Sequence, residues 1–173
     1  MRNVAWLWLG LLACGEGDAT PAPGDPDFVR DPALDVALAS EAGGATSHEA
    51  GTSCQHCHQA LGPGPGRFSV AGTLYTPEGS PADEGFVQIL SVLDGRELLR
   101  LPVDANGNFY TTQEIGLPDN AVLPVVLDEA GETVHGMPFP TTSGACNHCH
   151  TPAFRVSLHH HEAGETDTAA PAP

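Results

Sequence analysis

Basic side chains are scarce in this chain. Its 173 residues include 6 Lys and Arg against 22 Asp and Glu, and the formal net charge at pH 7 is −16 with neutral histidines. Because binding to phosphate backbones depends on Lys and Arg, we expect no nucleic-acid partner. The acidity is consistent with two interpretations, a surface that keeps the protein soluble or one that attracts a basic protein partner.

Several other sequence patterns are missing. Long amphipathic helical stretches do not occur, which argues against an all-helical domain. A Ser-His-Asp order, a phosphate-binding loop and a paired-carboxylate motif are also missing. We therefore expect neither enzymatic activity nor a small-molecule substrate. The apolar run from Val4 to Leu12 is too short for a transmembrane helix, which needs about 20 residues.

The N-terminal segment predicts export. Arg2 precedes the apolar run, and residues 11–14 read Leu-Leu-Ala-Cys, which resembles the bacterial lipoprotein box. This resemblance implies a signal peptide over residues 1–13 and a lipid-modified Cys14. The alternative is an ordinary secretory signal with an incidental cysteine. The first interpretation places the protein on a lipid anchor at the periplasmic or outer face of the cell envelope.

Four of the five cysteines lie in two copies of one short motif. Residues 54–58 read Cys-Gln-His-Cys-His and residues 146–150 read Cys-Asn-His-Cys-His. Cys-x-x-Cys-His is the attachment signature of c-type haem. Two thiols at this spacing can form thioethers with the two vinyl groups of a porphyrin, and the next histidine supplies the proximal iron ligand. The sequence thus predicts two covalent haems, attached at Cys54, Cys57, Cys146 and Cys149, with His58 and His150 as proximal ligands.

Two other chemistries use paired cysteines. Two Cys-x-x-Cys knuckles can hold one structural zinc ion, although the segment between residues 57 and 146 is longer than in a usual zinc ribbon. Each pair could also be a disulfide or a thioredoxin-like redox site, although the βαβ context of such sites is missing. The histidine after each second cysteine favours haem. A structural or adhesive envelope lipoprotein with a four-cysteine zinc site is the alternative that we retain.

The distal iron ligands are less constrained by the sequence. A methionine ligand would raise the reduction potential relative to two histidines, but an isolated methionine in a strand is more often a core residue. A histidine two residues before it would share its strand face. A histidine run near the C-terminus could instead be a metal-binding tail. The candidates are Met137, His135, His48, the run His159 to His161 and, inside the motifs, His56 and His148.

Between the motifs, the sequence predicts β-strands. Apolar and polar residues alternate, and turn sequences such as Asp94-Gly95 separate the alternating stretches. In one of them we expect Val87, Ile89 and Leu93 on the same face. A further alternation, at residues 154–158, follows the second motif. The six expected strands lie near residues 68–75, 86–93, 97–103, 109–112, 122–127 and 132–137. Such spacing predicts a mainly β fold, a single small antiparallel β-sandwich with haem-binding loops at both ends.

The stretch from Gly66 to Tyr110 resembles a carboxypeptidase regulatory-like, transthyretin-like β-sandwich. Its most visible mark is the Asp-x-x-Gly-x-Phe turn at residues 104–109. Residues 48–158 as a whole resemble exported cytochrome-like proteins with two Cys-x-x-Cys-His segments around such a sandwich. This resemblance implies haem attachment outside the cytoplasm, a methionine before the second motif, outer-sphere electron transfer and redox-protein partners.

The remaining segments are rich in Pro, Ala, Gly and acidic residues, a composition that cannot bury much apolar surface. We expect a disordered tether over residues 14–47 and a disordered tail over residues 162–173. The dihaem domain is then expected over residues 48–161.

Overall fold

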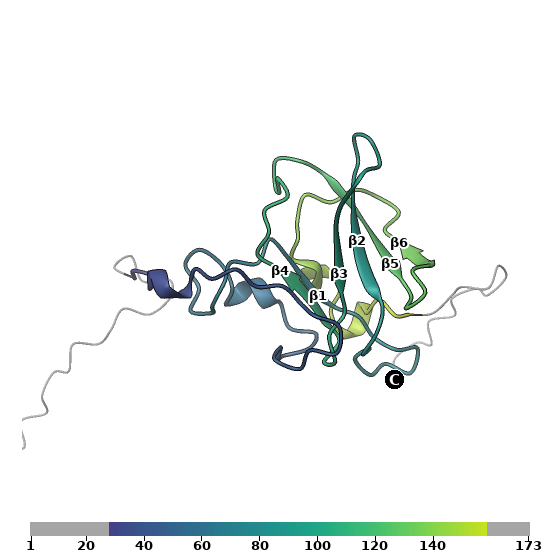
Figure 1. Cartoon of the computed structure of the whole chain (residues 1–173), viewed down its shortest axis with the longest axis horizontal. Helices are drawn as coiled ribbons and strands as arrows, with labels where there is room; N and C mark the ends of the chain where they lie inside the picture. Colours follow the sequence, from purple (N-terminus) through teal and green to yellow (C-terminus); the bar gives the residue numbers. More distant parts are fainter. Residues whose placement is uncertain (1–27, 159–173) are drawn as a thin grey trace, which may run out of the picture.

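The computed structural model describes residues 28–158. The described chain is mainly β (Figure 1). Its strands are β1 (Val70–Thr73), β2 (Phe86–Ser91), β3 (Glu97–Pro102), β4 (Asn108–Thr111), β5 (Val122–Leu127) and β6 (Thr133–Gly136). The expected signal peptide, Cys14, the first part of the tether, the run His159 to His161 and the tail lie outside the described residues.

The helical elements are single turns. They are η1 (Pro32–Leu34), η2 (Cys54–His56), α1 (Cys146–Cys149) and η3 (Pro152–Phe154). None of the helices within residues 28–158 has the length and apolar character needed to span a membrane. η2 begins at Cys54 and ends just before Cys57, and α1 spans Cys146–Cys149, so each motif lies on a single turn, as the sequence predicts.

The strands form two antiparallel sheets. One contains β1 and β4, and the other has the order β3-β2-β5-β6. All six strands predicted by the alternation are present, and the predicted fold class is confirmed.

The core lies between the two sheets and follows the strand register. On β2, Val87 pairs with Leu101 of β3 and with Val126 of β5, and Ile89 pairs with Leu99. These side chains are buried, and they form one apolar cluster with residues of β1 and β4. In the middle of the large sheet, the alternation of apolar and polar residues thus predicts correctly which side chains face the core.

Leu93 departs from this pattern. The alternation predicts it on the same face as Val87 and Ile89, but its side chain is 89% exposed. β2 ends at Ser91, and the register with β3 shifts between Ile89 and Leu90. A bulge places an extra residue on one strand and interrupts the alternation of faces. Leu93 therefore lies on the hairpin turn, outside the core.

The described part of the expected tether, residues 28–47, packs on the domain. Ala39 forms an antiparallel bridge with Thr111, and the Ser40 amide donates to the Tyr110 carbonyl at 2.9 Å. The Leu38 amide donates to Thr112 Oγ1 at 2.9 Å. The segment thus covers the outer edge of β4, whose backbone groups would otherwise lack a strand partner. Composition could not reveal this, because the contacts are backbone hydrogen bonds to residues far along the chain.

Candidate functional site

Both Cys-x-x-Cys-His motifs lie against the same short strand. η2 of the first motif and α1 of the second motif each contact β1. The Asn147 side-chain Nδ2 donates to the Thr52 carbonyl at 2.9 Å, so the second motif contacts the segment that leads into the first. Burial and, to a smaller extent, the charge of the Cys54 thiolate raise the pKa of the Cys146 thiol. The sequence predicts haem-binding loops at the two ends of the sandwich, and in the structure the two motifs both contact β1.

The second motif is held at both of its ends. Before it, the Ala71 amide of β1 donates to the Gly144 carbonyl at 2.9 Å. After it, the Tyr75 amide donates to the Val156 carbonyl at 3.0 Å and the Leu158 amide donates to the Tyr75 carbonyl at 2.8 Å. α1 is therefore a single turn between two segments that pair with the edge of β1 and its continuation.

The alternation at residues 154–158 produces only part of the expected strand. A single parallel bridge joins Tyr75 to Ser157, and η3 occupies Pro152–Phe154. Proline is favoured in the first turn of a helix, where its missing amide hydrogen is not needed. Pro152 thus starts a helical turn where the alternation of Phe154 and Val156 predicts extended chain.

Two glycines allow the close approach of the second motif to β1. A Cβ at Gly72 would lie 2.8 Å from the Cβ of Cys146 and 2.5 Å from the Cζ of Phe109. A Cβ at Gly144 would lie 1.8 Å from the carbonyl oxygen of Ser69. Any larger residue at either position would displace the chain that carries Cys146.

A buried polar network connects the two motifs through β1. Asn147 is 4% exposed, and its Oδ1 accepts from the Thr73 amide at 2.9 Å while its Nδ2 donates to Thr73 Oγ1 at 2.9 Å. Thr73 Oγ1 donates in turn to Asn108 Oδ1 at 2.7 Å. The Asn108 amide donates to Asp104 Oδ1 at 3.0 Å, so the network includes the Asp-x-x-Gly-x-Phe turn.

Sequence reasoning missed the role of Asn147. It occupies a variable position of the motif, and nothing in the local pattern distinguishes a buried asparagine from an exposed one there. Its three hydrogen bonds reach residues 74 and 95 positions earlier in the chain. Only the folded structure places those partners beside the motif.

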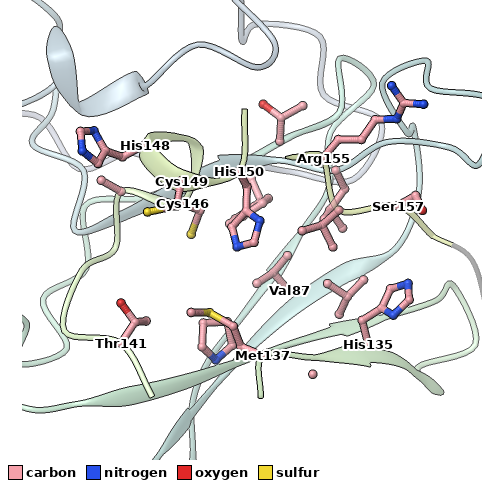
Figure 2. A pocket seen from close by; sticks show the side chains of 18 of the residues that line it. Val87, His135, Met137, Thr141, Cys146, His148, Cys149, His150, Arg155 and Ser157 are labelled. Atoms are coloured by element: carbon pink, nitrogen blue, oxygen red, sulfur yellow. The ribbon is translucent and has the colours of Figure 1, made fainter. Parts of the chain in front are cut away.

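A cavity of about 900 Å³ opens beside the second motif (Figure 2). One part of its wall carries Cys146, Cys149 and His150, and Figure 2 shows the His150 ring inside the cavity, with the two thiols to one side and Met137 on the wall below. Arg155 lines a further part. The apolar part of the wall is formed by Leu74, Val87, Phe109, Pro124, Val126 and Val156.

Met137 and His135 both line this cavity. The shared face is expected from their spacing on one strand. Met137 lies just beyond β6, and its amide donates to the Pro124 carbonyl at 3.0 Å, which continues the pairing with β5. In Figure 2, Met137 lies nearer to His150 in the view, and His135 lies farther along the wall. Their roles as ligands stay predictions.

The first motif has a different environment. The His58 side chain is 7% exposed, and its ring stacks on Phe68 with centroids 4.2 Å apart and planes 7° apart. Phe68 stacks in turn on Tyr110 with centroids 4.9 Å apart. A Cβ at Gly64 would lie 2.8 Å from His58 Nδ1, so the loop after the motif touches the imidazole directly.

Arg30 holds that loop in place. Its guanidinium donates to the carbonyls of Gly62, Gly64 and Gly66, the last two at 2.7 Å and 3.2 Å. Arg30 also pairs with Asp35 at 2.9 Å, and Arg67 contacts the same carboxylate. These two guanidinium groups, Arg67 first, lower the pKa of Asp35. Part of the segment predicted to be a tether therefore fixes the loop over His58.

Both predicted proximal histidines have the same ring nitrogen engaged. His58 Nδ1 lies 2.6 Å from the Pro65 carbonyl oxygen, and His150 Nδ1 lies 3.4 Å from the Phe154 carbonyl oxygen. An imidazole that donates from Nδ1 to a backbone carbonyl presents Nε2 as its metal-binding atom, which is the usual arrangement of metal-ligating histidines. The donor sets, two thiols and one oriented histidine in each motif, fit covalently attached haem.

The two cysteines of each motif differ in exposure. Burial raises the pKa of the Cys146 thiol to about 12, and burial also raises the pKa of Cys54. Cys57 and Cys149 are exposed, and none of the four cysteines within residues 28–158 forms a disulfide. Nor are three or more Cys, His, Asp or Glu side chains of this part of the chain grouped to hold one metal ion.

The other histidine candidates divide between the two motifs. His48 lies beside His58, with ring centroids 6.0 Å apart. His56 and His148 are exposed, and His148 also lines the cavity of the second motif.

Comparison of the whole chain with protein-family models, curated proteins and solved structures gave no match. The molecule is a small mainly β protein with two antiparallel sheets, and no family or homologue is identified for it.

Proposed function

We propose that this protein is a dihaem c-type cytochrome that transfers electrons at the bacterial cell envelope. The observation that carries the proposal is the cavity beside the second motif. Two attachment thiols, an oriented histidine and a thioether line one largely apolar space of about 900 Å³. That volume is near the upper end of the range for small-molecule and cofactor sites, as a porphyrin requires.

The residues of the second site have separate roles in this proposal. Cys146 and Cys149 would attach the haem through thioethers, and His150 Nε2, as the predicted proximal ligand, and Met137, as the predicted distal ligand, would bind its iron. Arg155, on the same cavity wall, provides a positive charge suited to the porphyrin carboxylates. The bound haem supplies a reversible one-electron iron couple. The apolar wall excludes water, and water exclusion and the thioether both act on the reduction potential.

The shared position of the motifs on β1 supports electron exchange within one chain. Cys54 and Cys57, with His58 as proximal ligand, form the first attachment site, and the Asn147 contact to Thr52 ties it to the second. The net charge of −16 favours a basic redox partner, whose association would weaken as salt screens the charges. The proposal includes no substrate chemistry and no nucleic acid.

The cellular setting and the family are part of the same proposal. The chain resembles exported cytochrome-like proteins whose carboxypeptidase regulatory-like sandwich lies between two haem motifs, and residues 11–14 resemble a lipoprotein box. We propose that Cys14 carries a lipid anchor at the periplasmic or outer face of the envelope. The structural lipoprotein with a four-cysteine zinc site is the alternative.

The deciding experiment is intact-mass measurement of protein produced in cells that have a haem-attachment system. We expect two added porphyrins for each chain, which survive denaturing electrophoresis and give a sharp reduced α-band. A matched control replaces all four motif cysteines by serine and should carry none. A protein that lacks covalent haem and instead contains zinc would contradict the proposal.

A further inference from the structure

We infer that His48 is the distal iron ligand at the first motif, so that the two sites differ in ligation, His–His at the first and His–Met at the second. The inference rests on the proposed function, because it assigns a ligand to a haem that this function requires. Three observations carry it: the distance between two rings, the way His48 is held, and the orientation of His58.

The separation of the rings suits one metal between them. The centroids of His48 and His58 are 6.0 Å apart, with planes 39° apart. Two imidazoles that bind one ion through nitrogen, each at about 2 Å, place their ring centres roughly 6 Å apart. The near-parallel stack of His58 on Phe68 is closer, with centroids 4.2 Å apart and planes 7° apart. The pair is therefore at the spacing of two axial ligands.

The backbone at His48 is held in place. The Asn108 side-chain amide donates to the His48 carbonyl at 3.2 Å and to Ser47 Oγ at 2.9 Å. The Asn106 side chain donates to the Ser47 carbonyl at 2.8 Å. Directly after His48, Glu49 has a φ of 53°, which lies in the left-handed region of backbone conformation. His48 is thus positioned by the buried network at the Asp104 turn, although its own side chain is exposed.

His58 is oriented for the complementary role. Its Nδ1 is engaged by the Pro65 carbonyl at 2.6 Å, and Phe68 covers one face of its ring. Nε2 is the nitrogen left for a metal. With His48 as the sixth ligand, this iron lacks the thioether that raises the potential of a His–Met site. The chain would then contain a lower-potential first site and a higher-potential second site, and an electron would move from the first to the second.

The test isolates the first site. In a Cys146→Ser, Cys149→Ser background, one haem remains, and its mass confirms loading. There, His48→Ala should convert the ferric iron from low spin to high spin in the electron paramagnetic resonance spectrum, and added imidazole should restore the low-spin signal. His48→Met should retain a six-coordinate iron and raise its potential. His56→Ala is the matched histidine control, since no neighbouring haem remains in this background, and its spectrum should not change.

A low-spin spectrum and an unchanged potential in both His48→Ala and His48→Met would overturn the inference while leaving the proposed function intact. If the proposed function is wrong, the result is different, because mass measurement of the parent protein would then show no covalent haem.

Discussion

The two motifs share a five-residue pattern and differ in almost everything around it. The second is a single turn whose flanks both pair with β1 and its continuation, and its histidine borders a cavity of about 900 Å³. The first is covered by a loop that Arg30 holds, and its histidine is buried between that loop and Phe68. On the proposed function, the same attachment chemistry would produce two different redox sites, because the surrounding fold would select the distal ligand and the access of water.

The side chains near each predicted proximal histidine differ in the same way. Beside His150, the cavity wall provides Met137 and His135, whereas the His58 ring stacks on Phe68 and lies 6.0 Å from the ring of His48. The following predictions test whether this difference gives the two proposed haems distinct reduction potentials.

Removal of one pair of cysteines should produce the largest effect. Cys54→Ser with Cys57→Ser should leave only the second haem, and Cys146→Ser with Cys149→Ser should leave only the first. Because axial ligands shift haem potentials by large fractions of a volt, we expect the second-site protein to have the higher potential, by on the order of 0.1 V. Intact mass counts the haems, and a spectroelectrochemical titration measures the potentials. Equal potentials in the two proteins would remove the proposed difference between the sites.

Met137→Ala should lower the potential of the second site only. Loss of the thioether should shift that potential downwards by on the order of 0.1 V, because sulfur ligation favours ferrous iron. The weak far-red band of Met-ligated iron should disappear at the same time. His135→Ala is the matched control on the same wall and should have a smaller effect. If Met137→Ala changes neither the band nor the potential, Met137 is a packing residue.

Asn147→Ala should destabilise the region that joins the two motifs. The substitution removes three hydrogen bonds and leaves the Thr73 amide and the Thr52 carbonyl without this partner. We expect the free energy of unfolding to fall by about 2–3 kcal/mol, measured by denaturant titration. The exposed Asn120 donates only to the Gly116 carbonyl at 3.4 Å, so Asn120→Ala should change stability by less than about 0.5 kcal/mol. Equal effects of the two variants would show that the network adds no stability.

The smallest expected effect concerns the thiols before haem attachment. Burial raises the pKa of Cys146 to about 12, so the folded chain holds this proton more tightly than the unfolded chain, whose cysteine pKa is about 8.5. This stabilisation is complete below the unfolded pKa and is lost as pH rises towards the folded pKa. Between about pH 8 and about pH 9.5, the haem-free protein should lose about 1 kcal/mol of stability.

Haem-free Cys146→Ala is the reference for this measurement, and it should show a shallower fall over the same pH range. Alkylation at neutral pH gives a second reading of the same difference. The exposed Cys57 and Cys149 should react before Cys146, because the thiolate is the reactive form and burial disfavours it. If Cys146 is alkylated as fast as Cys149, the Cys146 thiol is not shielded from solvent as the structure indicates.

Local sequence patterns were sufficient for the strands and for the motif residues. The alternation of Val87 and Ile89 predicted a core face, since side chains of a strand alternate between two faces. It failed at Leu93, where a register shift between Ile89 and Leu90 breaks the period. The spacing of each Cys-x-x-Cys-His motif predicts the haem-binding donor atoms, because that chemistry depends on residues within one turn of the chain, and this stays a prediction.

Features that depend on distant contacts could not be predicted. Asn147 and Thr73 are 74 positions apart, and nothing local relates them. Arg30 reaches Gly62 and Gly64 over 32 and 34 positions, so a segment with the composition of a tether became part of the first site. Composition reports how much apolar surface a segment can bury, but it does not report the backbone groups of another strand that the segment can satisfy.

The sequence by itself determined the acidic charge and the six short strands, and it predicts the two sets of haem-binding donors, because each depends on composition, periodicity or spacing within a few residues. Only the tertiary structure decided that both motifs share β1, that Met137 borders the cavity of His150 and that His48 lies 6.0 Å from His58. These relations arise where strand pairing brings distant segments together, and the close approaches at Gly72 and Gly144 and the buried hydrogen bonds of Asn147 then hold them in place.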